Sequence, residues 1–174
     1  MTWAELLKSQ AEAAYASAEG LLTMVTDDDL GWKPETGENW MTVGTLVRHI
    51  TDACGASCKG FVTGDWGMPE DFDPGKLPPS DMLPPAEAMP TIDSIDGARR
   101  LLAEDKRTAL AMIDQAGEDA LANRPASAPW DPREMPLGQR LLQMISHLEL
   151  HKAQLFYYLK LQGKPVNTMH LWSG

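Results

Sequence analysis

Basic residues, cysteines and long apolar runs are all scarce in this chain. The 174 residues include 15 Lys or Arg against 25 Asp or Glu, for a formal net charge of −10. Nucleic acids and anionic membrane surfaces are bound by clustered positive charge, so we expect neither as a partner. No run approaches the roughly 20 apolar residues that span a bilayer, and the first residues lack a signal peptide's basic and apolar regions. We therefore expect a cytoplasmic protein.

The two cysteines, Cys54 and Cys58, stand four residues apart in a helical pattern. Along one helix their Cβ atoms are too far apart for a disulfide, which needs about 3.5–4.5 Å. We interpret them as buried or half-buried thiols in a reducing compartment. The alternative, sulfur ligands beside His49, is disfavoured because Cys54 lies about 140° further round the helix.

Four segments carry the 3.6-residue period of an amphipathic helix, and none alternates convincingly as a strand would. They are residues 2–25, 42–57, 94–117 and 136–163. Thr2 with Glu5 forms a capping-box pattern, Thr42 is an expected N-cap, and Gly163 followed by Pro165 is a helix stop. The length suits one domain with a real core. We therefore predict a single all-α domain over residues 1–174.

An irregular insertion at about residues 63–92 separates the second and third predicted helices. Seven of the thirteen prolines lie between Gly64 and Pro90. A connection of this length is commonly functional or disordered, and its apolar residues favour an ordered segment packed on the helices. A shorter irregular connection, Asn123–Pro136, contains Trp130.

The four histidines give the clearest indication of function. His147 and His151 are one helical turn apart, so their rings share a face with Cβ atoms about 5–6 Å apart. His49, in the second predicted helix, lies at the edge of the apolar stripe, about 60° from Leu46. Three imidazoles facing one interior could hold a divalent cation and leave a coordination position open. A histidine on an apolar face can also be a satisfied core residue, and that alternative stays open.

Two motifs resemble a known family. The closing stretch His147-Leu148-Glu149-Leu150-His151-Lys152, with Gly163-Lys164-Pro165-Val166, is similar to the last helix of DinB/YfiT-like four-helix-bundle metalloproteins. The stretch from Leu30-Gly31-Trp32-Lys33-Pro34 to Arg48-His49-Ile50 looks like that family's lead into its second helix. The resemblance implies an up-down-down-up four-helix bundle, here with a long proline-rich loop between helices two and three.

The resemblance also implies a metal site. His49, His147 and His151 would be the ligands of one divalent ion, with zinc or nickel favoured. Relatives include thiol-dependent transferases that use a low-molecular-weight thiol, and presumed hydrolases, which implies a small-molecule substrate here. The family's name refers to DNA damage and is no evidence of DNA binding.

One position departs from the family pattern. Many relatives have Glu directly after the first helix-four histidine, as in zinc peptidases where that Glu is the general base. Here the position is Leu148, and Glu149 is about 100° further round the helix. Metal binding is still expected, but a glutamate-based hydrolysis is not.

Two classes of function follow. The first is a mononuclear metal-dependent transferase or hydrolase, with the insertion covering the mouth of the bundle near the metal. The second is a non-catalytic, metal-stabilised helical dimer or binding module, favoured by the missing Glu. Fold analogy alone does not decide between them.

Three further expectations concern other residues. Asp105, on the inward stripe of the third helix, either reaches solvent or pairs with Arg48 or Lys152, or it accepts a hydrogen bond from a ligand imidazole. His170 is expected in a surface tail, with a fourth-ligand role as the alternative. A homodimer is expected through apolar residues on the first and third helices: Ala11, Tyr15, Leu110 and Ala111.

Overall fold

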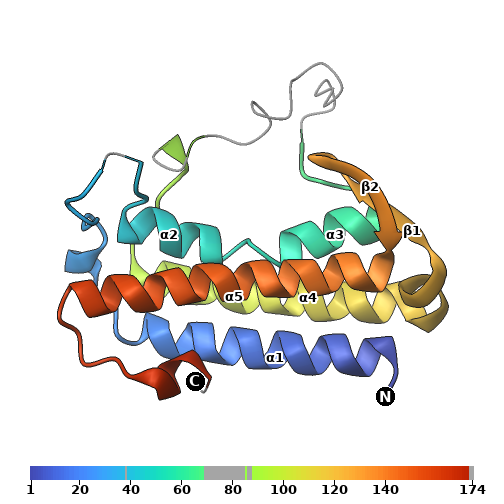
Figure 1. The fold of residues 1–174 in the computed structure, drawn as a ribbon, viewed down its shortest axis with the longest axis horizontal. Helices are drawn as coiled ribbons and strands as arrows, with labels where there is room; N and C mark the ends of the chain where they lie inside the picture. Colours follow the sequence, from blue (N-terminus) through green and yellow to red (C-terminus); the bar gives the residue numbers. More distant parts are fainter. Residues whose placement is uncertain (38, 69–84, 86–87, 173–174) are drawn as a thin grey trace.

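Three long helices lie side by side in the computed structural model, which describes residues 1–37, 39–68, 85 and 88–172 (Figure 1). They are α1 (Trp3–Leu22), α4 (Ile95–Asn123) and α5 (Leu137–Leu161). Two shorter helices, α2 (Val43–Ile50) and α3 (Gly55–Thr63), follow one another along the same axis and cover α4 and α5. Short 3₁₀ turns, η1 (Asp27–Asp29) and η5 (Thr168–Leu171), flank this assembly.

The predicted helix starts are confirmed. Thr2 Oγ1 accepts from the Glu5 backbone N–H at 3.1 Å, and the Glu5 carboxylate accepts from the Thr2 N–H at 2.8 Å. The Thr42 side chain accepts from the Thr45 N–H at the start of α2, and the Ser94 side chain accepts from the Gly97 N–H at the start of α4. Each cap satisfies an N–H that has no partner inside its helix. At Gly117, where the third helix is predicted to end, the backbone is non-helical, with φ 73° and ψ 158°, and α4 is kinked there before helical structure resumes and continues to Asn123.

The second predicted helix is not continuous. α2 ends at Ile50, and a turn precedes the start of α3 at Gly55. The Gly55 and Ala56 N–H groups donate to the Asp105 carboxylate, both at 2.9 Å, instead of to carbonyls one helical turn earlier. A Cβ on Gly55 would lie 2.1 Å from the Asp105 carbonyl oxygen, so glycine is needed for this approach. The break therefore depends on contact with α4.

The core lies between α1, α4, α5 and the α2–α3 pair. Its fully buried side chains include Leu7, Leu21, Leu46, Ile50, Ile113, Leu141, Ile145, Leu148 and Leu155. Ala11 and Tyr15 belong to this core, with relative exposures of 0% and 1%. The expectation that they form an external apolar patch is therefore wrong. Leu110 is half-buried and Ala111 is exposed.

The connection at Asn123–Pro136 is not irregular. It forms a two-stranded antiparallel sheet of β1 (Pro125–Ala128) and β2 (Asp131–Pro136). Pro125 pairs with Pro136, and the register shifts between Ala126 and Ala128. The all-α expectation is corrected accordingly: the chain is mostly helical with one small sheet.

Most of the proline-rich insertion, residues 69–84 and 86–87, lies outside the described residues, as does its predicted cover over the bundle. Its described beginning does pack on the protein: the Trp66 ring contacts Phe61 and Trp130 edge-on, with centroids 4.9 and 5.4 Å apart. Among the residues with described positions, no helix is long and apolar enough to cross a membrane.

The buried carboxylate of Asp105 generates a stability prediction. Replacing Asp105 with Ala leaves the buried Tyr15 hydroxyl and Gly55 N–H, and the partly buried Ala56 N–H, without their acceptor. We expect the free energy of unfolding to fall by about 3 kcal/mol. Urea unfolding followed by circular dichroism measures it.

The matched control is Asp114→Ala on the same helix. Asp114 is exposed and forms a surface ion pair with Lys8 at 2.7 Å. That change should cost less than about 1 kcal/mol. Equal losses for the two variants would show that the Asp105 contacts contribute no more than a surface ion pair.

Candidate metal centre

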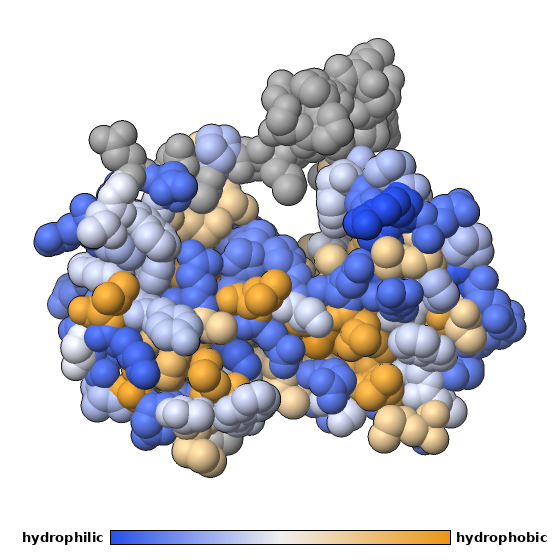
Figure 2. Space-filling model, in the orientation of Figure 1, coloured by the Kyte–Doolittle hydropathy of each residue, from blue (hydrophilic) through white to orange (hydrophobic). Residues whose placement is uncertain are grey.

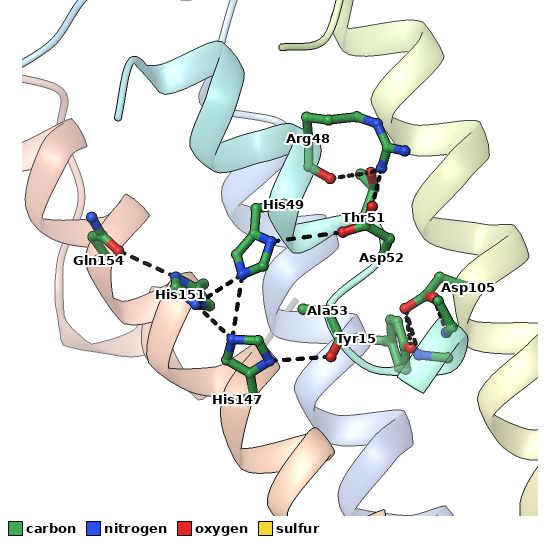
Figure 3. Close-up of polar contacts among 12 residues, drawn as sticks. Tyr15, Arg48, His49, Thr51, Asp52, Ala53, Asp105, His147, His151 and Gln154 are labelled. Atoms are coloured by element: carbon green, nitrogen blue, oxygen red, sulfur yellow. Dashed lines mark hydrogen bonds and ion pairs between the residues drawn. The ribbon is translucent and has the colours of Figure 1, made fainter. Parts of the chain in front are cut away.

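The structure brings three of the four histidines together. His49 lies in the last turn of α2, and His147 and His151 lie one turn apart on α5. Their Nε2 atoms form a triangle: 2.8 Å from His147 to His151, 3.1 Å from His49 to His151 and 3.3 Å from His49 to His147. Figure 3 shows the three rings pointing at one another from two helices.

The other ring nitrogens face outward to acceptors. His147 Nδ1 lies 3.3 Å from the Ala53 carbonyl oxygen, and His151 Nδ1 lies 3.2 Å from Gln154 Oε1. His49 Nδ1 lies 3.8 Å from Asp52 Oδ1, too far for a hydrogen bond but on the same outward side. Such acceptors favour the tautomer with its proton on Nδ1. The Nε2 lone pairs then converge on one point.

This donor set fits a divalent metal ion. Three nitrogens about 2.0–2.1 Å from a tetrahedral zinc stand about 3.3 Å apart, close to the spacing found here. Over the described part of the chain, these histidines are the one group of three or more His, Cys, Asp or Glu residues that could hold a metal. Imidazole nitrogen suits zinc and nickel among other ions. Three ligands leave a coordination position open.

Burial keeps the rings neutral. It lowers the pKa of His49 to about 4, with nearby His151, His147 and Arg48 adding to the shift. Burial likewise lowers the pKa of His147 and of His151. Neutral imidazole is the form that ligates a metal, so the site is ready to bind at neutral pH.

An ion pair organises the end of α2. Arg48 Nη1 donates to Asp52 Oδ2 at 2.6 Å and to Thr51 Oγ1 at 3.3 Å. Burial raises the pKa of Asp52, and the Arg48 guanidinium opposes that shift. The pair places the Asp52 carboxylate beside the outer edge of His49 (Figure 3).

Asp105 has neither of its predicted roles. It is buried, and its carboxylate accepts from the Tyr15 hydroxyl at 2.6 Å as well as from Gly55 and Ala56. Burial raises the pKa of Tyr15, which keeps that hydroxyl protonated as a donor. Asp105 reaches the site only indirectly, because the turn that it anchors contains Ala53, the hydrogen-bonding partner of His147.

The other predicted residues are placed as follows. His170 lies in η5, where its ring nitrogen accepts from the Asn167 N–H at 3.0 Å, and it is not part of the histidine group. Lys152 is buried and donates to Ser17 Oγ and the Leu171 carbonyl. Cys54 and Cys58 are buried free thiols, as predicted.

Sequence reasoning missed the groups that orient the rings. Asp52 and Gln154 each stand three residues after a histidine of the group, a helical spacing that could have indicated them. The Ala53 carbonyl has no such signal, because it depends on the break between α2 and α3.

A cavity of about 820 Å³ opens on the histidines and extends to the hairpin. Its lining includes Met41 and Met144 near the helices and Trp130 and Arg133 from the hairpin. Figure 2 shows the molecule hollowed between its α2 end and its hairpin end. The volume is typical of a small-molecule site.

Comparisons with known proteins agree with this architecture. The DinB superfamily matches residues 10–155, and the chain belongs to that superfamily. A DinB-like protein from Bacillus cereus is similar in structure, with a TM-score of 0.67, 16% identity, and coverage of 94% of this chain and 95% of that one. The DinB-like protein YjoA from Bacillus subtilis has a TM-score of 0.65, 16% identity, and coverage of 92% and 94%. No curated protein matches significantly.

The lowered histidine pKa values predict how the metal-free protein responds to acid. Unfolded His49 takes up a proton near its ordinary pKa of 6.5, whereas folded His49 does so only near 4. Stability is therefore full above about pH 6.5 and falls as the pH drops toward 4, by about 3 kcal/mol for this residue. Urea unfolding of the metal-free protein at several pH values measures the loss.

Other groups also titrate in this range, so the comparison is with variants. His49→Gln should show a shallower decline between pH 6.5 and 4, while His170→Gln should match the parent. An unchanged slope in His49→Gln would contradict the lowered pKa.

Proposed function

We propose that His49, His147 and His151 bind one divalent cation, zinc or nickel, and that the protein is a metal-dependent enzyme acting on a small molecule. One observation carries the proposal: three Nε2 atoms converge within 3.3 Å. Rings that all keep their proton on Nδ1 cannot satisfy one another at Nε2, whereas a cation satisfies all three.

The chemistry available follows from the cation and the cavity. A bound divalent cation would lower the pKa of a coordinated water or thiol, so that a nucleophile exists at neutral pH. The protein's own part is to orient the rings through Ala53 and Gln154, and to surround the site with apolar walls.

The cavity favours a thiol-dependent transferase over a hydrolase. Leu148, at the position of the usual glutamate base, is fully buried, and Glu149 does not line the cavity. The two carboxylates of the lining, Asp52 and Asp131, are both paired with arginine. Hydrolysis benefits from a free general base, whereas a thiol activated by the metal attacks without one.

The alternative is a non-catalytic, metal-stabilised dimer or binding module. It is also supported by the pairing of both lining carboxylates with arginine, because that pairing leaves neither of them free as a general base. The two functions differ in turnover: an enzyme transfers a thiol to a model electrophile at a rate that depends on added metal. A binding module takes up the metal without that rate.

Replacing both His147 and His151 with Ala should abolish stoichiometric metal, because one imidazole alone does not hold a cation tightly. Elemental analysis of protein purified without a histidine tag gives the ratio, with His170→Ala as the control that keeps one ion per chain. If the double variant retains one ion per chain, His147 and His151 are not the metal ligands.

A homodimer remains part of the proposal, but through a different surface. Three large apolar side chains on one side of α5 are exposed: Leu150 at 69%, Tyr157 at 62% and Leu161 at 66%. They recur at helical spacing, and Figure 2 shows apolar patches on the face that carries α5. A two-fold contact would bury this stripe against its copy.

Light scattering at micromolar concentration should give twice the 19.1 kDa mass of the chain. Tyr157→Glu should return it to the monomer mass, because a buried unpaired charge opposes association. A parent protein that is monomeric throughout the accessible concentrations would refute the dimer.

A further inference from the structure

The cavity beside the histidines has a second polar region, formed by the hairpin and its neighbours. Its lining there includes Trp130, Arg133, Gln143 and Ser57. None of these four is part of the histidine group or contacts its rings through a described hydrogen bond.

Arg133 keeps one edge of its guanidinium free. Its Nε donates to Asp131 Oδ1 at 2.8 Å and its Nη2 donates to Asp131 Oδ2 at 2.9 Å. This pairing occupies the side of the planar guanidinium that carries Nε and one hydrogen of Nη2. The end edge, formed by Nη1 and the second hydrogen of Nη2, has no described partner and can receive a carboxylate in the two-bond geometry that arginine favours.

Two neighbours add unused hydrogen-bond donors. The Gln143 oxygen accepts from Arg140 Nη1 at 3.1 Å, which leaves its NH₂ group without a partner within the described residues. The Ser57 hydroxyl has no described partner either. In contrast, the two carboxylates of the lining, Asp52 and Asp131, already accept hydrogen bonds from arginine. The cavity therefore offers free donors and no free carboxylate.

Arg140 holds this arrangement in place. Its side chain is only 3% exposed, and Nη1 donates to Asp131 Oδ2 at 3.0 Å. Its other nitrogens donate to the Ala126, Asp131 and Arg133 carbonyls. The hydrogen bonds of this buried guanidinium therefore fix the position of the hairpin, including the strand that carries Arg133 beside the cavity.

The charge of the region is unusual for this protein. The chain carries a net charge of −10, yet the charged side chains of the cavity lining are two carboxylates and two guanidiniums, with a sum of zero. On α5, Met144 provides an apolar wall between the hairpin and the histidines, three residues before His147, whereas Met41 and Met89 line the cavity beyond the histidines, near the start of α2.

From these observations we infer that Arg133, assisted by Gln143 and Ser57, binds the carboxylate of a small carboxylic acid with an apolar body. That the other end of this molecule lies at the metal rests on the proposed function. The carboxylate site at Arg133 does not depend on it. The apolar body lies along Met144, and the carboxylate accepts hydrogen bonds from the free edge of Arg133.

The first experiment needs no metal. Metal-free protein is titrated with hexanoate and with hexanol, and the indole N–H resonance of Trp130 is followed by NMR. Hexanoate should bind roughly tenfold more tightly than hexanol, because a charge-assisted pair to arginine is worth about 1.4 kcal/mol or more. Arg133→Gln should remove that preference, whereas Arg100→Gln, an exposed arginine on α4 outside the cavity, should keep it.

The second experiment uses zinc-loaded protein and calorimetry with ω-mercaptohexanoate and ω-mercaptohexanol. Both should bind, the acid roughly tenfold more tightly, and Arg133→Gln should make the two equal. If neither thiol binds but the hexanoate preference persists, the thiol-dependent function fails and the carboxylate site stands. If Arg133→Gln leaves the hexanoate preference of the metal-free protein unchanged, the carboxylate site is overturned whatever the metal does.

Discussion

The geometry of the site depends on the buried carboxylate of Asp105. By accepting the Gly55 and Ala56 N–H groups, it ends one helix and starts another. The turn between them directs the Ala53 carbonyl at His147 and places Asp52 beside His49. The carboxylate is satisfied by three donors, and burial is the largest cause of its raised pKa, so its position is costly unless all three contacts persist. A single carboxylate on α4 thus sets the relation between two helices that it does not belong to.

The histidine site was predictable because the spacing of residues within each helix determines which way the three rings face. A spacing of four residues puts His147 and His151 on one face of α5, and the apolar stripe around Leu46 turns His49 inward. The structure brings the three together as the helical period indicates. The break in α2–α3 was not predictable, since the carboxylate that causes it lies about fifty residues further along the chain, where the sequence shows only an acidic residue on an apolar face.

The hairpin was missed for a related reason. Residues 125–136 contain prolines, charges and no alternation of apolar residues, so their local propensity indicates a loop. The strands instead depend on a guanidinium from outside the segment, Arg140 on α5, which bonds to the carbonyls of both strands. The same bonds remove Arg140 from the surface and leave Arg133 as the hairpin's accessible cation: its side chain is 79% exposed. Tertiary hydrogen bonding, rather than sequence pattern, creates this part of the cavity.

Charge links the two ends of the cavity. Three neutral imidazoles would leave a bound divalent ion with its full charge of about +2, and the carboxylates of the lining are already neutralised by arginine. An anionic ligand is the group that such a site lacks, and a thiolate would supply one under the proposed function. At the hairpin, the unpaired edge of the Arg133 guanidinium likewise favours an anionic hydrogen-bond acceptor. In a chain of net charge −10, long-range electrostatic repulsion opposes anions, so binding of an anionic ligand would depend on these short-range contacts. The affinity of the cavity for anions should therefore depend on these few donors rather than on the overall field of the protein.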